Sequence, residues 1–136
     1  MLDTDVLVAA FRSERRASRE LLIAALDESF VLLASTALWL EYEAVLTRPL
    51  HLAAMELSAA EVTDVLAALA VVAEPVPIHF LSRPVLADAE DEHVLDLAMN
   101  DRADMLVTFN QDDFVEASDT FQIEVVTPAA ALRRLR

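Results

Sequence analysis

The pattern of apolar and polar positions divides the chain into short strands and longer amphipathic helices. Apolar residues recur at helical spacing in some segments and form short continuous runs in others. The expected helices cover 5–11, 16–29, 36–48, 58–73, 88–100 and 127–136. The expected strands or extended segments cover 1–3, 30–35, 74–80, 104–109 and 121–126. Short apolar strands that alternate with helices indicate an α/β fold, with a parallel sheet and helices on both of its faces.

Local signals place several helix ends. Ser58 and Glu61 form a capping-box pattern at the start of one helix, and the preceding helix is expected to end before Pro49. The chain contains no glycine. Residues that tolerate a left-handed backbone must replace it, so we expect Asn100 or Asp101 to end the helix at 88–100.

The composition restricts the classes of function. The length of 136 residues fits one domain, 1–136, and the net charge is −14 with all ten basic residues being arginine. A broad basic surface for nucleic acid is therefore excluded, although carboxylates that hold divalent cations can reverse the local field. The alternative is that the acidic surface only maintains solubility. The absence of cysteine and of a long apolar stretch leads us to expect a cytoplasmic protein without a membrane segment.

Carboxylates occur where an α/β fold places its ligands, at the carboxyl ends of the strands. Asp3 and Asp5 follow the first strand, and Glu41 falls on the shoulder of an apolar helix stripe. Asp91 faces the apolar side of the helix at 88–100. Each residue has a structural explanation as well, as a helix cap, a first-turn acid or a solvated position.

A further polar group, Asn110, Asp112 and Asp113, follows the strand at 104–109. These residues could simply form a turn. Together, however, four separate elements deliver carboxylates to one end of the expected sheet. Oxygen ligands without cysteine or clustered histidine favour Mg²⁺ or Mn²⁺ over Zn²⁺.

One dense group of basic side chains lies outside the carboxyl terminus. It comprises Arg12, Arg15, Arg16 and Arg19. A solvated helix face is the simplest interpretation, and a contact with a partner or an RNA backbone is the alternative. The three histidines are far apart and lack ligand spacing.

Four segments in this order resemble the PIN-domain family: "LDTDVLVAA", "LWLEYEAVLTRP", "DAEDEHVLDLA" and "ADMLVTFNQDDF". The similarity is greatest to the VapC-like toxin components of toxin–antitoxin systems. The resemblance implies a three-layer α/β/α sandwich around a central, mainly parallel sheet. It also implies an Mg²⁺- or Mn²⁺-dependent endoribonuclease that hydrolyses RNA phosphodiester bonds to 5′-phosphate and 3′-hydroxyl products.

The resemblance assigns roles to individual residues. It implies that Asp3, Glu41 and Asp91 are the catalytic acids and metal ligands, with Glu41 either a ligand or the residue that orients the attacking water. Asp112 or Asp113 supplies a further carboxylate to the metal.

Three further residues play supporting parts in this assignment. Thr108 matches the hydroxyl residue of the family motif. Asp5 stands where the family usually has asparagine, and Asn110 is neutral where many relatives have aspartate.

The resemblance also implies partners, namely an RNA substrate and a cognate antitoxin protein. The many apolar helix positions lead us to expect a homodimer. Two alternatives stay open. A PIN-like domain with a degraded metal site could act as a binding module. An Asp-nucleophile phosphatase of the haloacid-dehalogenase type would also use "LDTDVL", but its chemistry normally needs a lysine, which this chain lacks.

Overall fold

The computed structural model describes residues 1–12, 15–76, 103–115, 118–119 and 123–135. Its helices are α1 (Thr4–Arg12), α2 (Arg16–Leu26), α3 (Thr36–Leu46), α4 (Pro49–Met55), α5 (Ala59–Val72), α8 (Pro128–Arg134) and the 3₁₀ helix η1 (Gln111–Phe114). Its strands are β1 (Leu33–Ala34), β2 (Glu74–Pro75), β3 (Leu106–Val107) and β4 (Val125–Val126). The expected helix at 88–100 lies outside the described residues.

All strand pairing in the described segments is parallel. β1 pairs with β2 in one two-stranded sheet, and β3 pairs with β4 in another. Leu2 forms a parallel bridge with Val107, and the backbone N–H of Asp3 donates to the carbonyl of Val107 at 2.9 Å. The first residues of the chain therefore lie along β3, as expected for an α/β fold. The described residues form two short sheets in place of one continuous sheet, and by themselves they do not establish three layers.

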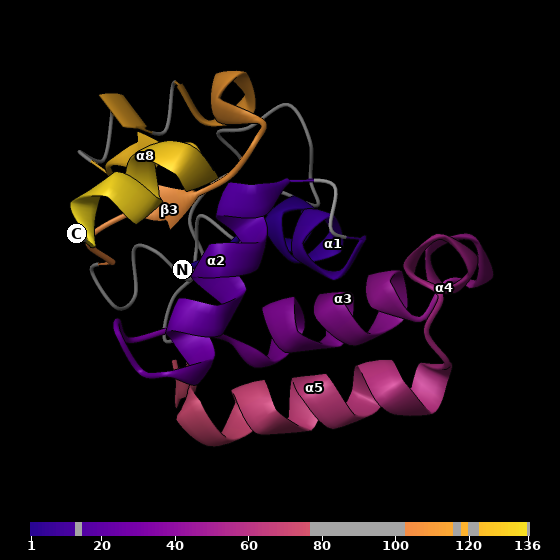
Figure 1. Cartoon of the computed structure of the whole chain (residues 1–136). Helices are drawn as coiled ribbons and strands as arrows, with labels where there is room; N and C mark the ends of the chain where they lie inside the picture. Colours follow the sequence, from indigo (N-terminus) through magenta and orange to yellow (C-terminus); the bar gives the residue numbers. More distant parts are fainter. Residues whose placement is uncertain (13–14, 77–102, 116–117, 120–122, 136) are drawn as a thin grey trace.

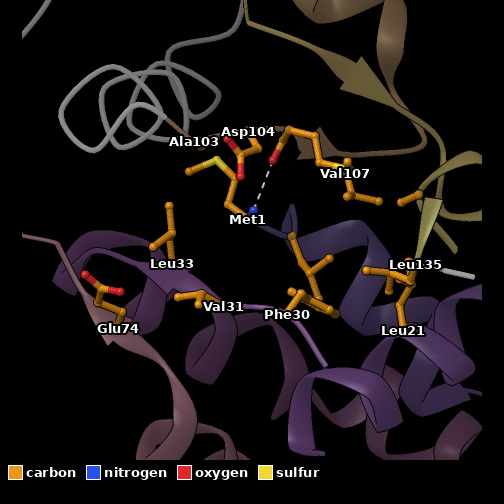
Figure 2. Close-up of a pocket in the computed structure, with 13 residues that line it drawn as sticks. Met1, Leu21, Phe30, Val31, Leu33, Glu74, Ala103, Asp104, Val107 and Leu135 are labelled. Carbon is orange, nitrogen blue, oxygen red and sulfur yellow. Dashed lines mark hydrogen bonds between the residues drawn. The ribbon is translucent and has the colours of Figure 1, made fainter. Parts of the chain in front are cut away.

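A mainly apolar pocket of about 470 Å³ is lined by residues of both sheets. Leu33 of β1 and Val107 of β3 both line it, and Figure 2 shows Met1 between them. The amino group of Met1 donates to the carbonyl of Met105 at 3.1 Å. Burial lowers the pKa of this amino group to about 6, because the charged form loses hydration there.

The helices bury apolar stripes around this β-structure. Figure 1 shows α3 and α5 side by side, with α1 close to α2 and α3. Tyr42 of α3 is fully buried, and its hydroxyl donates to the backbone carbonyl of Leu2. Its ring makes an edge-to-face contact with Trp39, with 5.7 Å between the ring centroids. Tyr42 thus connects α3 to the segment that carries the first acidic residues.

The caps confirm several expected helix starts. Ser58 and Glu61 form both hydrogen bonds of the capping box at the start of α5. Ser35 caps α3 by accepting from the N–H of Leu38 at 3.1 Å. Thr127 caps α8. These side chains satisfy N–H groups that the first helical turn leaves without partners.

The left-handed positions differ from expectation. Glu28 follows α2 and Glu56 follows α4, and both have φ of 57°. Glutamate is not a residue that favours this region, so no residue-type rule would have chosen these positions. Asn100 and Asp101 lie outside the described residues.

One helix boundary was wrong and one helix was missed. α2 ends at Leu26 and does not continue to 29. The short helix α4 was not expected, although Pro49 occupies its first turn, where the missing N–H has no cost. None of the helices in the described segments is long and apolar enough to span a membrane.

Candidate functional site

A groove of about 870 Å³ collects most of the expected site residues. Its walls come from the start of α1, from α3 and α4, and from the segment after β3. The expected residues that line it are Asp3, Asp5, Glu41, Asn110 and Asp113. Asp112 is exposed and is not among its lining residues, whereas Asp91 lies outside the described residues.

Asp3 is a buried carboxylate with a fixed orientation. It is only 6% exposed and directly precedes α1. Its Oδ1 accepts from the N–H of Thr4 at 2.8 Å, and its Oδ2 accepts from the buried hydroxyl of Thr108 at 2.8 Å. The capping explanation for Asp3 is therefore correct in part, because one oxygen satisfies the first helical N–H. The same side chain also lines the groove.

Asp5 lies in an environment that disfavours its charge. Its Oδ2 accepts from the N–H of Phe109 at 3.0 Å and from the side-chain amide of Asn110 at 3.1 Å. Its Oδ1 is buried and accepts no hydrogen bond within the described part of the chain. Burial, followed by repulsion from Asp3, raises the pKa of Asp5 to about 6, against the opposing effect of hydrogen bonds from the backbone of Phe109 and the hydroxyl of Thr108.

Glu41 faces the groove from the shoulder of α3, as its position in the helical stripe predicted. It is half-buried beside the fully buried Tyr42. The hydroxyl of Thr4 donates to Glu41 Oε2. Since the N–H of Thr4 donates to Asp3, Thr4 connects the carboxylate of Asp3, just before α1, with that of Glu41 in α3. Burial, with Asp3 and Glu41 nearby, raises the pKa of Tyr42 well above its usual value, so it stays a neutral donor.

Thr108 and Asn110 have the supporting positions expected of them. The fully buried hydroxyl of Thr108 donates to Asp3, lies 3.3 Å from Asp5 Oδ2 and accepts from the N–H of Asn110 at 3.0 Å. The amide of Asn110 donates to Asp5 and so acts as a donor to a carboxylate. Asp113 lines the same groove, which favours it over Asp112 as the carboxylate of this segment.

The donor chemistry of the groove fits a hard divalent cation. The available ligands are carboxylate oxygens, and the buried Oδ1 of Asp5 has no hydrogen-bond partner among the described residues. Within the described ranges, no three Asp, Glu, His or Cys side chains lie close enough to hold an ion by themselves. Any complete ligand set therefore needs rearrangement or a residue outside these ranges, and Asp91 is the candidate that sequence reasoning supplies.

The same groove is also lined by basic side chains, which sequence reasoning missed. Arg15, Arg48 and His51 line it together with the ring of Phe109. Arg48 and His51 come from the start of the unexpected helix α4. The expected helix at 36–48 contained a signal for Arg48, because Arg48 lies seven positions after Glu41 and so on the same helical face. No signal in the sequence pairs Arg15 or His51 with the carboxylates.

The basic cluster noted in the sequence separates into different roles. Arg16 pairs with Glu20 at 3.0 Å on an exposed helix face, as the simpler interpretation predicted. Arg19 donates to the carbonyl of Ala10 at 3.4 Å. Of this cluster, Arg15 lines the groove.

Acidic side chains at the ends of parallel strands, facing a groove between helices, form the candidate site of an α/β protein. A family model described as the PIN domain matches residues 1–112. The chain therefore belongs to the PIN domain family, whose members are typically nucleases and generally use divalent metals. No curated protein and no solved structure matches the chain.

Proposed function

We propose that the protein is a metal-dependent endoribonuclease and the toxin of a toxin–antitoxin pair. One observation supports this proposal most directly. Asp3, Asp5 and Glu41 line one groove, and the buried Asp5 Oδ1 has no described donor. Repelling carboxylates at a buried site are explained by a cation that offsets their charge.

The proposed metal is Mg²⁺ or Mn²⁺, held by Asp3, Glu41, Asp91 and Asp113. When bound, it would lower the pKa of the attacking water and offset the charge that develops on the phosphate. Asp3 is suited to this role because Thr4 and Thr108 hold both of its oxygens in place. The proposed fold around this centre is a three-layer α/β/α sandwich in one domain, 1–136.

The proposed partners follow from the same assignment. A cognate antitoxin would contact the acidic groove with a basic segment, since the chain carries a net charge of −14. The proposal also includes that the protein forms a homodimer and acts in the cytoplasm. Co-purification with a small basic protein encoded next to this one would support the toxin role, and purification alone with free activity would contradict it.

The test of the nuclease compares carboxylate variants with a matched control. Asp3→Asn and Asp91→Asn should each abolish Mn²⁺-dependent cleavage of RNA while the circular dichroism spectrum stays that of the wild type. Asp64→Asn is the control, because Asp64 is an exposed carboxylate on α5 and does not line the groove. Wild-type activity in both groove variants would refute the proposal.

A second candidate, a PIN-like binding module, is favoured by one feature. Asn110 directs its amide toward Asp5, where a carboxylate would have added a ligand. Calorimetry separates the two functions. A nuclease binds Mn²⁺ at up to millimolar concentration with release of protons from Asp5, whereas a module with a degraded site shows no heat of binding.

A further inference from the structure

The groove is lined by both acidic and basic side chains. Asp3, Asp5 and Glu41 are its carboxylates, and Arg15 and Arg48 are its arginines. Two arginines at one groove are notable in a chain with a net charge of −14 and only ten basic residues. A strongly acidic protein repels polyanions over most of its surface, so local arginines determine where a polyanion can approach.

The two arginines of the groove are exposed. Arg15 and Arg48 are both exposed, and neither forms an ion pair with a carboxylate in the segments that the structure describes. Each directly precedes a helix, Arg15 before α2 and Arg48 before α4. These helix starts fix the backbone positions from which the two side chains reach the groove.

Phe109 adds an aromatic side chain to the lining of the groove. The residue is 38% exposed although it lies just after the buried strand β3. Its backbone N–H donates to Asp5 at 3.0 Å, which fixes it beside the carboxylates. The guanidinium carbon of Arg15 lies 5.8 Å from the centroid of the ring, in cation–π range. The ring is thus held in place with part of its surface exposed.

An exposed aromatic ring beside arginines is the combination that binds single-stranded nucleic acid. Arginine contacts phosphate, and the ring stacks on an unpaired base without sequence preference. A base inside a duplex is stacked on its neighbours and cannot reach such a ring unless it is extruded. The arrangement therefore selects unpaired strands.

We propose that Phe109, Arg15 and Arg48 form a subsite for single-stranded RNA, in which Phe109 stacks on a base and the arginines contact the flanking phosphates. This subsite rests on the proposed nuclease function, and it assigns the residues of this chain that would hold the strand. A strand bound there lies in the same groove as the carboxylates Asp3, Asp5 and Glu41. His51 also lines the groove.

The test measures RNA binding without cleavage. A fluorescein-labelled oligouridylate is titrated with protein in Ca²⁺, with gel analysis to verify that the RNA stays intact, and the dissociation constant is measured by anisotropy over a range of salt concentrations. Phe109→Leu should weaken binding about tenfold, because the stacked base has no aromatic face to contact, and leave the salt dependence unchanged. Phe109→Tyr, which keeps the aromatic face, should bind as the wild type does.

The arginine variants have a different signature. Arg15→Ala and Arg48→Ala should each weaken binding and lower the slope of log K against log salt by about 0.7 for each phosphate that the protein no longer neutralises. Arg16→Ala is the matched control, since Arg16 pairs with Glu20 outside the groove. The substituted side chains are exposed, and thermal unfolding should verify that every variant is folded.

The outcomes separate this inference from the proposed function. Unchanged affinity and salt slope in the groove variants, or equal affinity for the annealed duplex, would overturn the subsite. If Phe109→Leu and Arg48→Ala then cleave RNA with the wild-type KM, the subsite fails and the nuclease stands. If the wild type binds RNA through these residues but never cleaves it in Mn²⁺, the subsite stands and the nuclease fails.

Discussion

Asp5→Asn changes one atom of the side chain and removes a charge that the folded protein holds at a cost. Asp5 has a pKa raised to about 6, first because it is buried and then because Asp3 repels it. The hydrogen bonds from Phe109 and Asn110 to its Oδ2 can be kept by the carbonyl oxygen of an asparagine. The substitution therefore removes the repulsion and keeps the local contacts.

The sign of the effect follows from the direction of the shift. An acid whose pKa is raised in the folded state contributes stability below its unfolded pKa of 3.8, and this contribution is lost as the pH rises through about 6. Above that range the ionised Asp5 destabilises the metal-free protein. The full shift, from 3.8 to about 6, corresponds to about 3 kcal/mol at about 1.4 kcal/mol for each pKa unit. Because Asp5 is half-buried, solvent screening reduces this to about 1–1.5 kcal/mol.

Thermal unfolding in EDTA measures this difference. At pH 7.5, Asp5→Asn should unfold about 3–5 °C above the wild type, and at pH 4 the two midpoints should nearly coincide. Asp64→Asn, an exposed position on α5, serves as the control for loss of a negative charge from an acidic protein. A variant that is no more stable at pH 7.5, or whose gain is the same at both pH values, would refute this account of Asp5.

Other measurements test the remaining parts of the site and core. Mn²⁺ at a hundredfold excess over its dissociation constant should raise the unfolding free energy of the wild type by about 2.7 kcal/mol and leave that of Asp3→Asn unchanged. Calorimetric unfolding measures both, and equal shifts of the unfolding temperature in the two proteins would contradict metal binding at Asp3. Thr108→Val removes the buried donor to Asp3 and should lower the unfolding free energy in urea by about 1–3 kcal/mol, and an unaltered midpoint would count against that bond. Tyr42→Phe removes the donor to the carbonyl of Leu2 and should lower the free energy of unfolding by about 1–2 kcal/mol in the same assay. An unchanged free energy of unfolding would contradict a contribution from this hydrogen bond.

Much of the helical structure is predictable because its signals are local. The capping box of α5 involves Ser58 and Glu61, and both of its hydrogen bonds form as expected. The stripe of α3 correctly placed Tyr42 inside and Glu41 on the shoulder, because helical spacing determines which positions share a face. Such features need no knowledge of distant parts of the chain.

The errors occur where several segments determine the outcome together. The apolar run at 30–35 satisfies a strand pattern, but only Leu33–Ala34 pair with β2. Glu28 and Glu56 adopt φ of 57° although their type disfavours it, since the chain must turn there and has no glycine to use. Helix α4 was missed because its seven residues are too few for a periodic pattern.

The candidate site shows the same division between local and distant information. The carboxylates could be found because each follows a strand or lies on a helix stripe, and an α/β fold places strand ends at one edge. Phe109 and Arg15 could not be paired in this way. They are far apart in the sequence, and the periodicity of a helix or strand relates only positions within the same element. Their cation–π contact depends on how α2 packs beside the segment after β3. The acidic residues of the groove thus follow from fold class, whereas the residues proposed to select its substrate follow only from the packing of this particular chain.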